Sequence, residues 1–312
     1  MRLLEKIRFA VFTDLHHDKI PDGEKRLEEF LATVSRVAPD FIIELGDLCY
    51  PAEENRFLLE KLERTGVPCY HVIGNHDSDR SSQKNVLEFY GIPRSYYSFV
   101  KGSIKFLVLD ACHIKRPDGA EPYGMRNYSG ATDPYPYLPP EQLIWLEKEL
   151  QSWTGDAVVF SHHSLVNSFA RRGVANREEV RAVLERGTAN GKVLLCMNGH
   201  DHGHHAVEVS GIWYYTLNAM SYIWHGMKEL YPYPQDVHDR YPGLKDIILY
   251  DVGLHGVVTI TGDGGIVIEG MQGQYRNVTP ADAGILHNRW NGISIDPMVS
   301  SLRVEGVGAK DE

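Results

Sequence analysis

The sequence contains few cysteines, and none of them is placed in a paired motif. Four occur in 312 residues, and no two form a Cys-x-x-Cys pair. Each of them, Cys49, Cys69, Cys112 and Cys196, lies in or beside an apolar segment that we expect to be a strand. The spacing therefore favours buried, reduced thiols over a cysteine-based metal or redox site.

The chain also lacks an excess of positive charge. Lys and Arg total 32 against 42 Asp and Glu, which gives a net charge of -10 at pH 7. A surface of this sign repels nucleic-acid backbones, so nucleic acid is disfavoured as a partner. A nuclease is disfavoured for the same reason, because it needs a basic track for the strand.

Long apolar runs are absent as well, and no uninterrupted apolar segment is long enough to span a bilayer. Residues 1–6 lead almost at once into a strand-like segment, which leaves no room for a secretory signal. We therefore expect a cytoplasmic protein without a membrane partner. The hydrophobic fraction of 43% and the charged fraction of 24% are those of a soluble globular protein.

The first third of the chain predicts alternating strands and helices. Apolar segments at 7–13, 41–45 and 69–73 are typical of buried strands, and segments 22–37 and 53–64 carry apolar residues at helical spacing. The remainder predicts an antiparallel pair at 96–100 and 104–110, helices at 140–150 and 177–184, and strands at 157–160, 193–197, 206–209, 213–217, 247–250, 257–260 and 266–269. Such a pattern indicates an α/β protein with its site in the loops after the strands.

Two long stretches interrupt this order, at 113–139 and 231–243, and both are rich in Pro and Tyr. Loops of this length in a compact domain are usually functional or disordered, and their tyrosines argue against disorder. We expect either walls over the functional site or surface decoration. The whole is expected to form a catalytic domain over 1–270 with these two insertions, followed by a C-terminal extension over 271–312 packed on the same domain.

Five short segments with metal-ligand residues follow the expected strands. They are Asp14-Leu15-His16, Gly46-Asp47, Gly74-Asn75-His76-Asp77, Ser161-His162-His163 and Gly199-His200-Asp201-His202. The set resembles the calcineurin-like metallophosphoesterases, whose pattern is DxH, GD, GNH(D/E), H and GHxH in that order. The resemblance implies a four-layer α/β/β/α sandwich of two facing mixed sheets.

The resemblance also implies a dinuclear metal centre in which Asp47 bridges the two ions. The first ion would be held by Asp14, His16, Asp47 and His202, and the second by Asp47, Asn75, His162 and His200. Imidazole and carboxylate donors without thiolate fit manganese, iron, zinc or cobalt, and the family favours manganese or iron with zinc. His163 could replace His162 as a ligand. Six other histidines are expected to be solvated or hydrogen-bonded instead: His17, His113, His204, His205, His225 and His238, of which His225 is the best further candidate for the pocket.

His76 stands outside both ligand sets, and the resemblance implies that it donates to the phosphoryl oxygen or protonates the leaving group. Asp77 would either orient His76 or cap the next helix.

The implied activity is hydrolysis of a small phosphate ester by a metal-bridging hydroxide. A diester is expected over a monoester, because a monoester dianion gains from extra cations and Arg80 is the one cation in the motif loops, although Arg126, Arg171 or Arg172 could fold inward. A phosphomonoesterase and a non-catalytic metal-binding scaffold are the alternatives. In a scaffold we would expect some ligand residues of the family pattern to be replaced, and none is replaced here. The sequence does not determine an oligomeric state.

Overall fold

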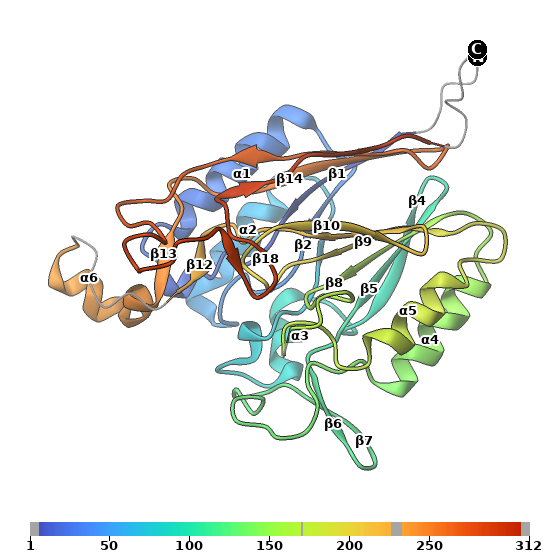
Figure 1. The fold of residues 1–312 in the computed structure, drawn as a ribbon, viewed down its shortest axis with the longest axis horizontal. Coiled ribbons are helices and arrows are strands. Elements are labelled where there is room, and N and C mark those ends of the chain that lie inside the picture. Colours follow the sequence, from blue (N-terminus) through green and yellow to red (C-terminus); the bar gives the residue numbers. More distant parts are fainter. Residues whose placement is uncertain (1–5, 170, 226–232, 307–312) are drawn as a thin grey trace.

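Two six-stranded sheets lie face to face in the computed structural model, which describes residues 6–169, 171–225 and 233–306 (Figure 1). The strand order is β20-β15-β14-β1-β2-β3 in the first sheet and β10-β11-β9-β8-β5-β4 in the second. In the first sheet β1, β2 and β3 are parallel, and β14 is antiparallel to β1. In the second sheet β5, β8 and β9 are parallel, and β4 is antiparallel to β5. Each sheet therefore contains neighbouring parallel strands, along one edge of the first sheet and in the centre of the second, and the loops with the candidate ligands follow these strands.

The elements have the following bounds. The strands of the first sheet are β1 (Lys6–Phe12), β2 (Phe41–Glu44), β3 (Cys69–His71), β14 (Gly256–Thr261), β15 (Ile266–Glu269) and β20 (Leu302–Val304). Those of the second sheet are β4 (Tyr97–Lys101), β5 (Ile104–Leu109), β8 (Ala157–Ser161), β9 (Val193–Asn198), β10 (His205–Val209) and β11 (Ile212–Thr216). Short strand pairs are formed by β6 (His113–Arg116) with β7 (Gly119–Pro122), β12 (Tyr222–Trp224) with β13 (Ile247–Leu249), β16 (Met271–Gln272) with β19 (Met298–Val299) and β17 (Arg289–Trp290) with β18 (Ile293–Ser294). The helices are α1 (Gly23–Val37), α2 (Arg56–Glu63), α3 (Gln83–Tyr90), α4 (Pro140–Gln151), α5 (Arg177–Glu185) and α6 (Gln235–Arg240), with 3-10 turns at His17–Lys19, Glu53–Asn55, His76–Ser78 and Pro242–Asp246.

Aromatic side chains hold the two sheets together. Phe9 of β1 lies 5.6 Å from Phe160 of β8 and 6.0 Å from Phe106 of β5, measured between ring centroids, and all three rings are fully buried. Both contacts are edge-to-face, a geometry that aromatic pairs prefer. The alternate residues of each strand point to the opposite face, so each sheet needs a second cover on its outer side.

Amphipathic helices supply that cover. On the first sheet, Leu27 and Phe30 of α1 pack in one cluster with Phe12 of β1. On the second, Leu146 of α4 and Val183 of α5 share a cluster with residues of β5, β8 and β9. The result is the expected four-layer α/β/β/α sandwich, and the predicted fold class is confirmed.

The predicted elements agree with the structure to within one or two residues at most ends, but the prediction omitted several short strands: β6, β7, β12, β16, β17, β18, β19 and β20. The sequence-based prediction did not include α3, although Val86, Phe89 and Tyr90 are spaced to face one side of a helix and Ser82 accepts a capping hydrogen bond from the backbone N–H of Asn85. The stretch 231–243, predicted to be irregular, contains α6 and the start of a 3-10 turn. Its first two residues lie outside the described part of the chain.

The C-terminal segment contributes to the central core. Ile295 and Val299 belong to the cluster between the sheets, and β20 pairs with β15 at the edge of the first sheet. The predicted division of the chain at residue 270 stays a prediction.

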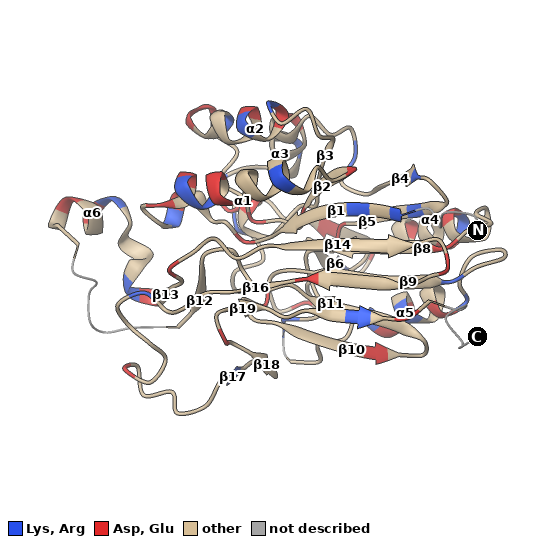
Figure 2. Ribbon diagram, turned by 90° about the horizontal axis from the view of Figure 1, so that it is seen from above, with Lys and Arg blue, Asp and Glu red and all other residues tan. Residues whose placement is uncertain are grey.

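Charges of both signs are mixed along the surface helices. Figure 2 shows Lys and Arg interspersed with Asp and Glu on α1, where Lys25 lies 3.7 Å from Glu29. None of the described helices combines the length and the apolar character that crossing a bilayer requires.

Candidate metal centre

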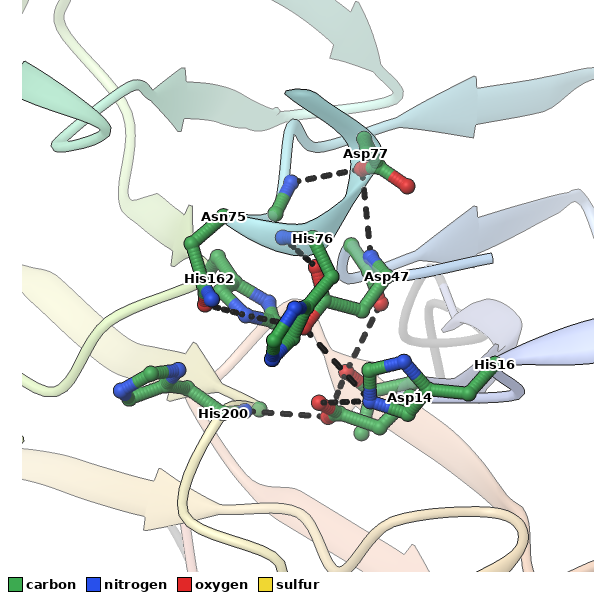
Figure 3. Close-up of polar contacts among 12 residues, drawn as sticks. Asp14, His16, Asp47, Asn75, His76, Asp77, His162 and His200 are labelled. Atoms are coloured by element: carbon green, nitrogen blue, oxygen red, sulfur yellow. Dashed lines mark hydrogen bonds and ion pairs between the residues drawn. The ribbon is translucent and has the colours of Figure 1, made fainter. Parts of the chain in front are cut away.

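The candidate ligands lie in loops that leave the carboxyl ends of parallel strands. Asp14 follows β1, Asp47 follows β2 and Asn75 follows β3, while His162 and His200 follow β8 and β9 of the other sheet. Figure 3 shows these side chains converging around Asp47. Two sheets that face each other with their strand ends at one edge thus bring together residues that are far apart in the sequence.

The side chains form two groups, each with ligand atoms within 4.8 Å of one another. One group contains Asp14, His16 and His202, and the other contains Asp47, His162 and His200. Asn75 joins the second group, because its Oδ1 lies 3.2 Å from His162 Nε2. The resemblance implied these same residues for the two ions, with Asp47 added to the first group.

Asp47 lies between the two groups. Its Oδ2 is 3.6 Å from His16 Nε2 in the first group and 3.2 Å from His162 Nε2 in the second. Its Oδ1 is already engaged, since it accepts a 2.7 Å hydrogen bond from the backbone N–H of His76. A single free oxygen is therefore within reach of both groups, which is the requirement for a bridging ligand.

Among the candidate ligands, two buried carboxylate oxygens have no hydrogen-bond donor from the described residues. They are Asp14 Oδ1 and Asp47 Oδ2, and both aspartates are at most 1% exposed. Asp14 Oδ2, in contrast, accepts from the Thr13 hydroxyl at 2.6 Å and from the His200 backbone N–H at 3.0 Å. An unpaired charged oxygen is costly to bury, and a bound cation would remove that cost. The donor set therefore fits a pair of metal ions.

Backbone carbonyls fix the orientation of two imidazoles. His162 donates its Nδ1–H to the carbonyl of Leu45 at 2.7 Å, and His202 donates its Nδ1–H to the carbonyl of Tyr222 at 2.7 Å. Because Nδ1 carries the proton in each ring, Nε2 retains the lone pair that a metal needs. In both rings Nε2 is the atom that faces the aspartates.

Burial and the carboxylates shift the imidazole pKa values in opposite directions. Burial lowers the pKa of His16 to about 3, despite the nearby Asp14 and Asp47. Burial also disfavours charge on His162, but the attraction and hydrogen bond of Asp47 outweigh it and raise its pKa to about 10. Without a metal, a proton on His162 thus balances the carboxylates, and a metal ion has to displace that proton.

Two motif glycines lie so close to neighbouring residues that no side chain fits at either position. Gly46 has a φ of 102°, and a Cβ there would lie 2.5 Å from His162 Nδ1. A Cβ on Gly74 would lie 2.2 Å from Asp47 Oδ1. A side chain at either position would displace the bridging candidate or the imidazole beside it.

Backbone strain occurs at five of the candidate ligands. Positive φ values between 49° and 66° occur at Asp14, His16, Asp47, His200 and His202. Non-glycine residues in this region cost free energy and are typically found at functional sites, where the surrounding structure enforces them.

His76 is oriented by residues that the motifs did not reveal. Its Nδ1 lies 2.6 Å from Asp79 Oδ2, and the Tyr128 hydroxyl donates to Asp79 Oδ1 at 2.5 Å. Tyr128 also accepts a 3.2 Å hydrogen bond from the Asn75 amide. The ammonium of Lys19 lies 3.1 Å from His76 Nδ1. Asp79 is three residues after His76 in a helical turn, which is a usable sequence signal, whereas Tyr128 and Lys19 come from distant loops.

Asp77 neither orients His76 nor caps the next helix, the two roles predicted for it. Its Oδ2 accepts from the backbone N–H groups of Gly74 at 2.8 Å and Asp47 at 3.2 Å, and its Oδ1 accepts from the Tyr90 hydroxyl at 3.0 Å. It therefore ties the loop after β3 to the loop after β2. In the structure Asp79 contacts the His76 ring, and Ser82 caps α3.

His163 and His225, the further candidates from the sequence, lie outside both ligand groups. His163 is 1% exposed, and its ring lies 4.3 Å from that of His200. His225 stacks on Trp290 at 5.5 Å instead. Its neighbour Trp224 is the residue at the site, since the indole N–H donates to His202 Nε2 at 3.1 Å.

A cavity of about 260 Å³ opens onto the ligand groups. It is lined by Asp47, His76, Arg126, Arg172, His200, His202 and Trp224. Arg80, by contrast, lies over the Tyr50 ring at 4.3 Å. Arg80 is thus not among the residues that line this cavity, whereas Arg126 and Arg172, two of the three arginines that the sequence left open as inward-folding, are.

The structure also resembles proteins of known fold. A dimetal phosphatase from Danio rerio aligns with a TM-score of 0.59 and 18% identity over 87% of this chain and 96% of that chain. GAP50, the anchor in the inner membrane complex of Plasmodium, aligns at 0.55 and 16% identity over 93% and 90%. The purple acid phosphatase PPD1 from yellow lupin (Lupinus luteus) aligns at 0.54 and 14% identity over 88% and 52%. At these identities the likeness concerns the fold.

No curated protein sequence gives a significant match to the chain. The family model of the calcineurin-like phosphoesterases matches residues 7–204. That span is more than half of the chain and contains every candidate ligand. The protein belongs to the calcineurin-like phosphoesterase family.

Proposed function

We propose that this protein is a metal-dependent hydrolase of small phosphate monoesters. The observation that carries the proposal is the pairing of two ligand groups with two arginines in one cavity. Asp14, His16, Asp47 and His202 would hold one ion, and Asp47, Asn75, His162 and His200 the other. Manganese, iron or zinc ions there would polarise the phosphoryl oxygens and supply water of lowered pKa as the nucleophile.

The residues around the ligands have separate tasks in this proposal. Asp79 accepts from His76 Nδ1, which leaves Nε2 as the nitrogen that donates a proton to the leaving oxygen. Arg126 and Arg172 offer N–H groups to the phosphoryl oxygens that the ligand groups do not reach. Tyr128 keeps Asp79 in place, and Trp224 lines the cavity beside His202.

The arginines favour a monoester over the diester that the sequence alone suggested. A monoester dianion carries one more negative charge than a diester, so it gains more from each added cation. Arg126 is exposed, and its side chain has no hydrogen bond or ion pair to another described residue. It is therefore free to bind a substrate oxygen.

A phosphodiester is the second candidate, and a second cavity supports it. This cavity, of about 430 Å³, adjoins the first and has room for a further ester substituent. A non-catalytic scaffold has less support, because the ligand groups are complete and two carboxylate oxygens among them are left without donors from the described residues.

Matched substrates test the proposal. The Mn²⁺-loaded protein should hydrolyse p-nitrophenyl phosphate with a higher kcat/KM than methyl p-nitrophenyl phosphate, which has the same leaving group. Arg126→Leu should lower kcat/KM on the monoester about tenfold or more and affect the diester less. Arg94→Leu, an exposed arginine outside the cavity, is the control. A preference for the diester would reverse the assignment, and hydrolysis of neither would remove the enzymatic function.

A further inference from the structure

A second cavity adjoins the metal-facing one and has a different lining. It measures about 430 Å³ and shares Arg172 and His200 with its neighbour. Asn75, a candidate ligand, also lies on its wall. A phosphoryl group held between the ligand groups therefore has this cavity within reach of its ester oxygen. The volume is in the range of about 300–1,000 Å³ that is typical of small-molecule sites.

Aromatic rings form much of the wall, and we refer to the space as the tyrosine cavity after Tyr123, Tyr128 and Tyr135. The Tyr123 and Tyr128 rings lie 4.6 Å apart, and those of Tyr128 and Tyr135 lie 6.3 Å apart. Phe169 closes the lining from another loop and is 55% exposed. A large apolar ring left this exposed on the wall of a cavity still has a face that a ligand can cover.

Buried polar groups accompany the rings. His163 lines the tyrosine cavity, is 1% exposed, and has an Nδ1 without a hydrogen-bond partner among the described residues. The Tyr128 hydroxyl is already engaged by Asp79 and Asn75. Rings that stack, together with a histidine that can still form a hydrogen bond, suit a flat group with polar atoms on its edge.

The charge of the lining decides which organic groups fit. Arg171 and Arg172 both line the cavity, and among its described lining residues there is no carboxylate. Tyrosine faces attract cations, but the guanidinium of Arg171 already lies 5.1 Å from the centre of the Tyr135 ring. An ammonium group would therefore meet positive charge without a counter-ion. Neutral or anionic groups meet no such cost.

We infer that the tyrosine cavity binds an uncharged or anionic aromatic ring carried by the phosphate ester. The inference names the organic part of the substrate and so rests on the proposed function. It holds for a monoester and for a diester, because either one places an ester substituent beside His200 and Arg172.

Non-hydrolysable phosphonates test the inference by binding alone. Titration calorimetry of the Mn²⁺-loaded protein should show phenylphosphonate binding roughly tenfold more tightly than methylphosphonate, since the ring buries apolar area. The 2-aminoethyl analogue, which carries a cation, should bind no more tightly than methylphosphonate. Equal affinity for phenyl- and methylphosphonate, or preference for the aminoethyl compound, would overturn the inference.

Variants of the lining residues test whether the preference for phenylphosphonate arises in the tyrosine cavity. Phe169→Ala and Tyr135→Ala should each reduce the phenyl preference several-fold and leave methylphosphonate affinity unchanged. Phe169 is exposed, so its variant is expected to fold even if Tyr135→Ala does not. Ile144→Ala, which removes a 69% exposed side chain on α4, is the matched control and should retain the preference. Retention of the preference in Phe169→Ala would also overturn the inference.

Hydrolysis distinguishes failure of this inference from failure of the proposed function. If the protein hydrolyses phosphate esters but binds phenyl- and methylphosphonate equally, the tyrosine cavity is not a ring site and the function stands. If it binds phenylphosphonate preferentially but hydrolyses no ester, the ring site stands and the function is wrong.

Discussion

Replacement of Asp79 by asparagine tests the orientation of His76. The Asp79 carboxylate lies 2.6 Å from His76 Nδ1, and Tyr128 holds its other oxygen. The amide in Asp79→Asn would keep the shape of the side chain but lose the negative charge that stabilises a protonated ring. Hydrogen bonds to charged groups contribute about 1.5–3 kcal/mol, so a step that needs the His76 proton should slow by about 10- to 150-fold.

The assay compares leaving groups. An alkyl phosphate needs a proton on its leaving oxygen, whereas p-nitrophenyl phosphate does not, so Asp79→Asn should lower kcat on the former by that factor and on the latter only slightly. Metal content should not change, because Asp79 is in neither ligand group. Asp118→Asn, in the exposed turn between β6 and β7, is the control. An equal loss on both substrates, or loss of metal, would refute the proton-donor role of His76.

Four further results are expected. Asp47→Ala should lose both ions, because its Oδ2 is within reach of both groups, and elemental analysis showing two retained ions would contradict this. Metal binding at pH 7 should release a proton from His162, whose pKa is raised to about 10, and calorimetry in buffers of different ionisation enthalpy measures it. For the same reason the metal-free protein should lose stability as the pH rises from about 6.5 toward 10, because the folded state holds this proton more tightly than the unfolded state. Phe160→Ala should lower the free energy of unfolding by about 3–5 kcal/mol in urea titrations, since Phe160 is fully buried between the sheets, whereas exposed Ile144→Ala should change it by less than about 0.5 kcal/mol.

The sequence indicated the framework of the fold, and its resemblance to a known family implied the candidate ligands that the structure brings close together. Segment 157–160 is a continuous apolar run and segment 41–45 is apolar apart from Glu44. They end just before His162 and Asp47, and parallel strands place such ends at one edge of a sheet. The sequence also showed the motif glycines, but only the structure explains why glycine is needed there. A Cβ on Gly46 would meet His162, and a Cβ on Gly74 would meet Asp47.

Local patterns were weaker where an element is short. The eight residues of α3 carry a helical spacing that the sequence-based prediction omitted, and α6 forms within a segment rich in Pro and Tyr. In α6 none of the six residues is buried, so the segment offers no apolar periodicity to detect.

Only the tertiary structure decided what surrounds the metal centre. Lys19, Arg126 and Arg172 reach the site from separate loops, and Tyr128 reaches Asp79 from an insertion 49 positions further along the chain. Loop positions carry no periodic signal, and the path of a loop depends on what it packs against. The sequence thus indicated which residues could bind metal, because regular strands align their ends. The charge and the aromatic rings around those residues were determined by how the irregular segments fold back over the strand ends.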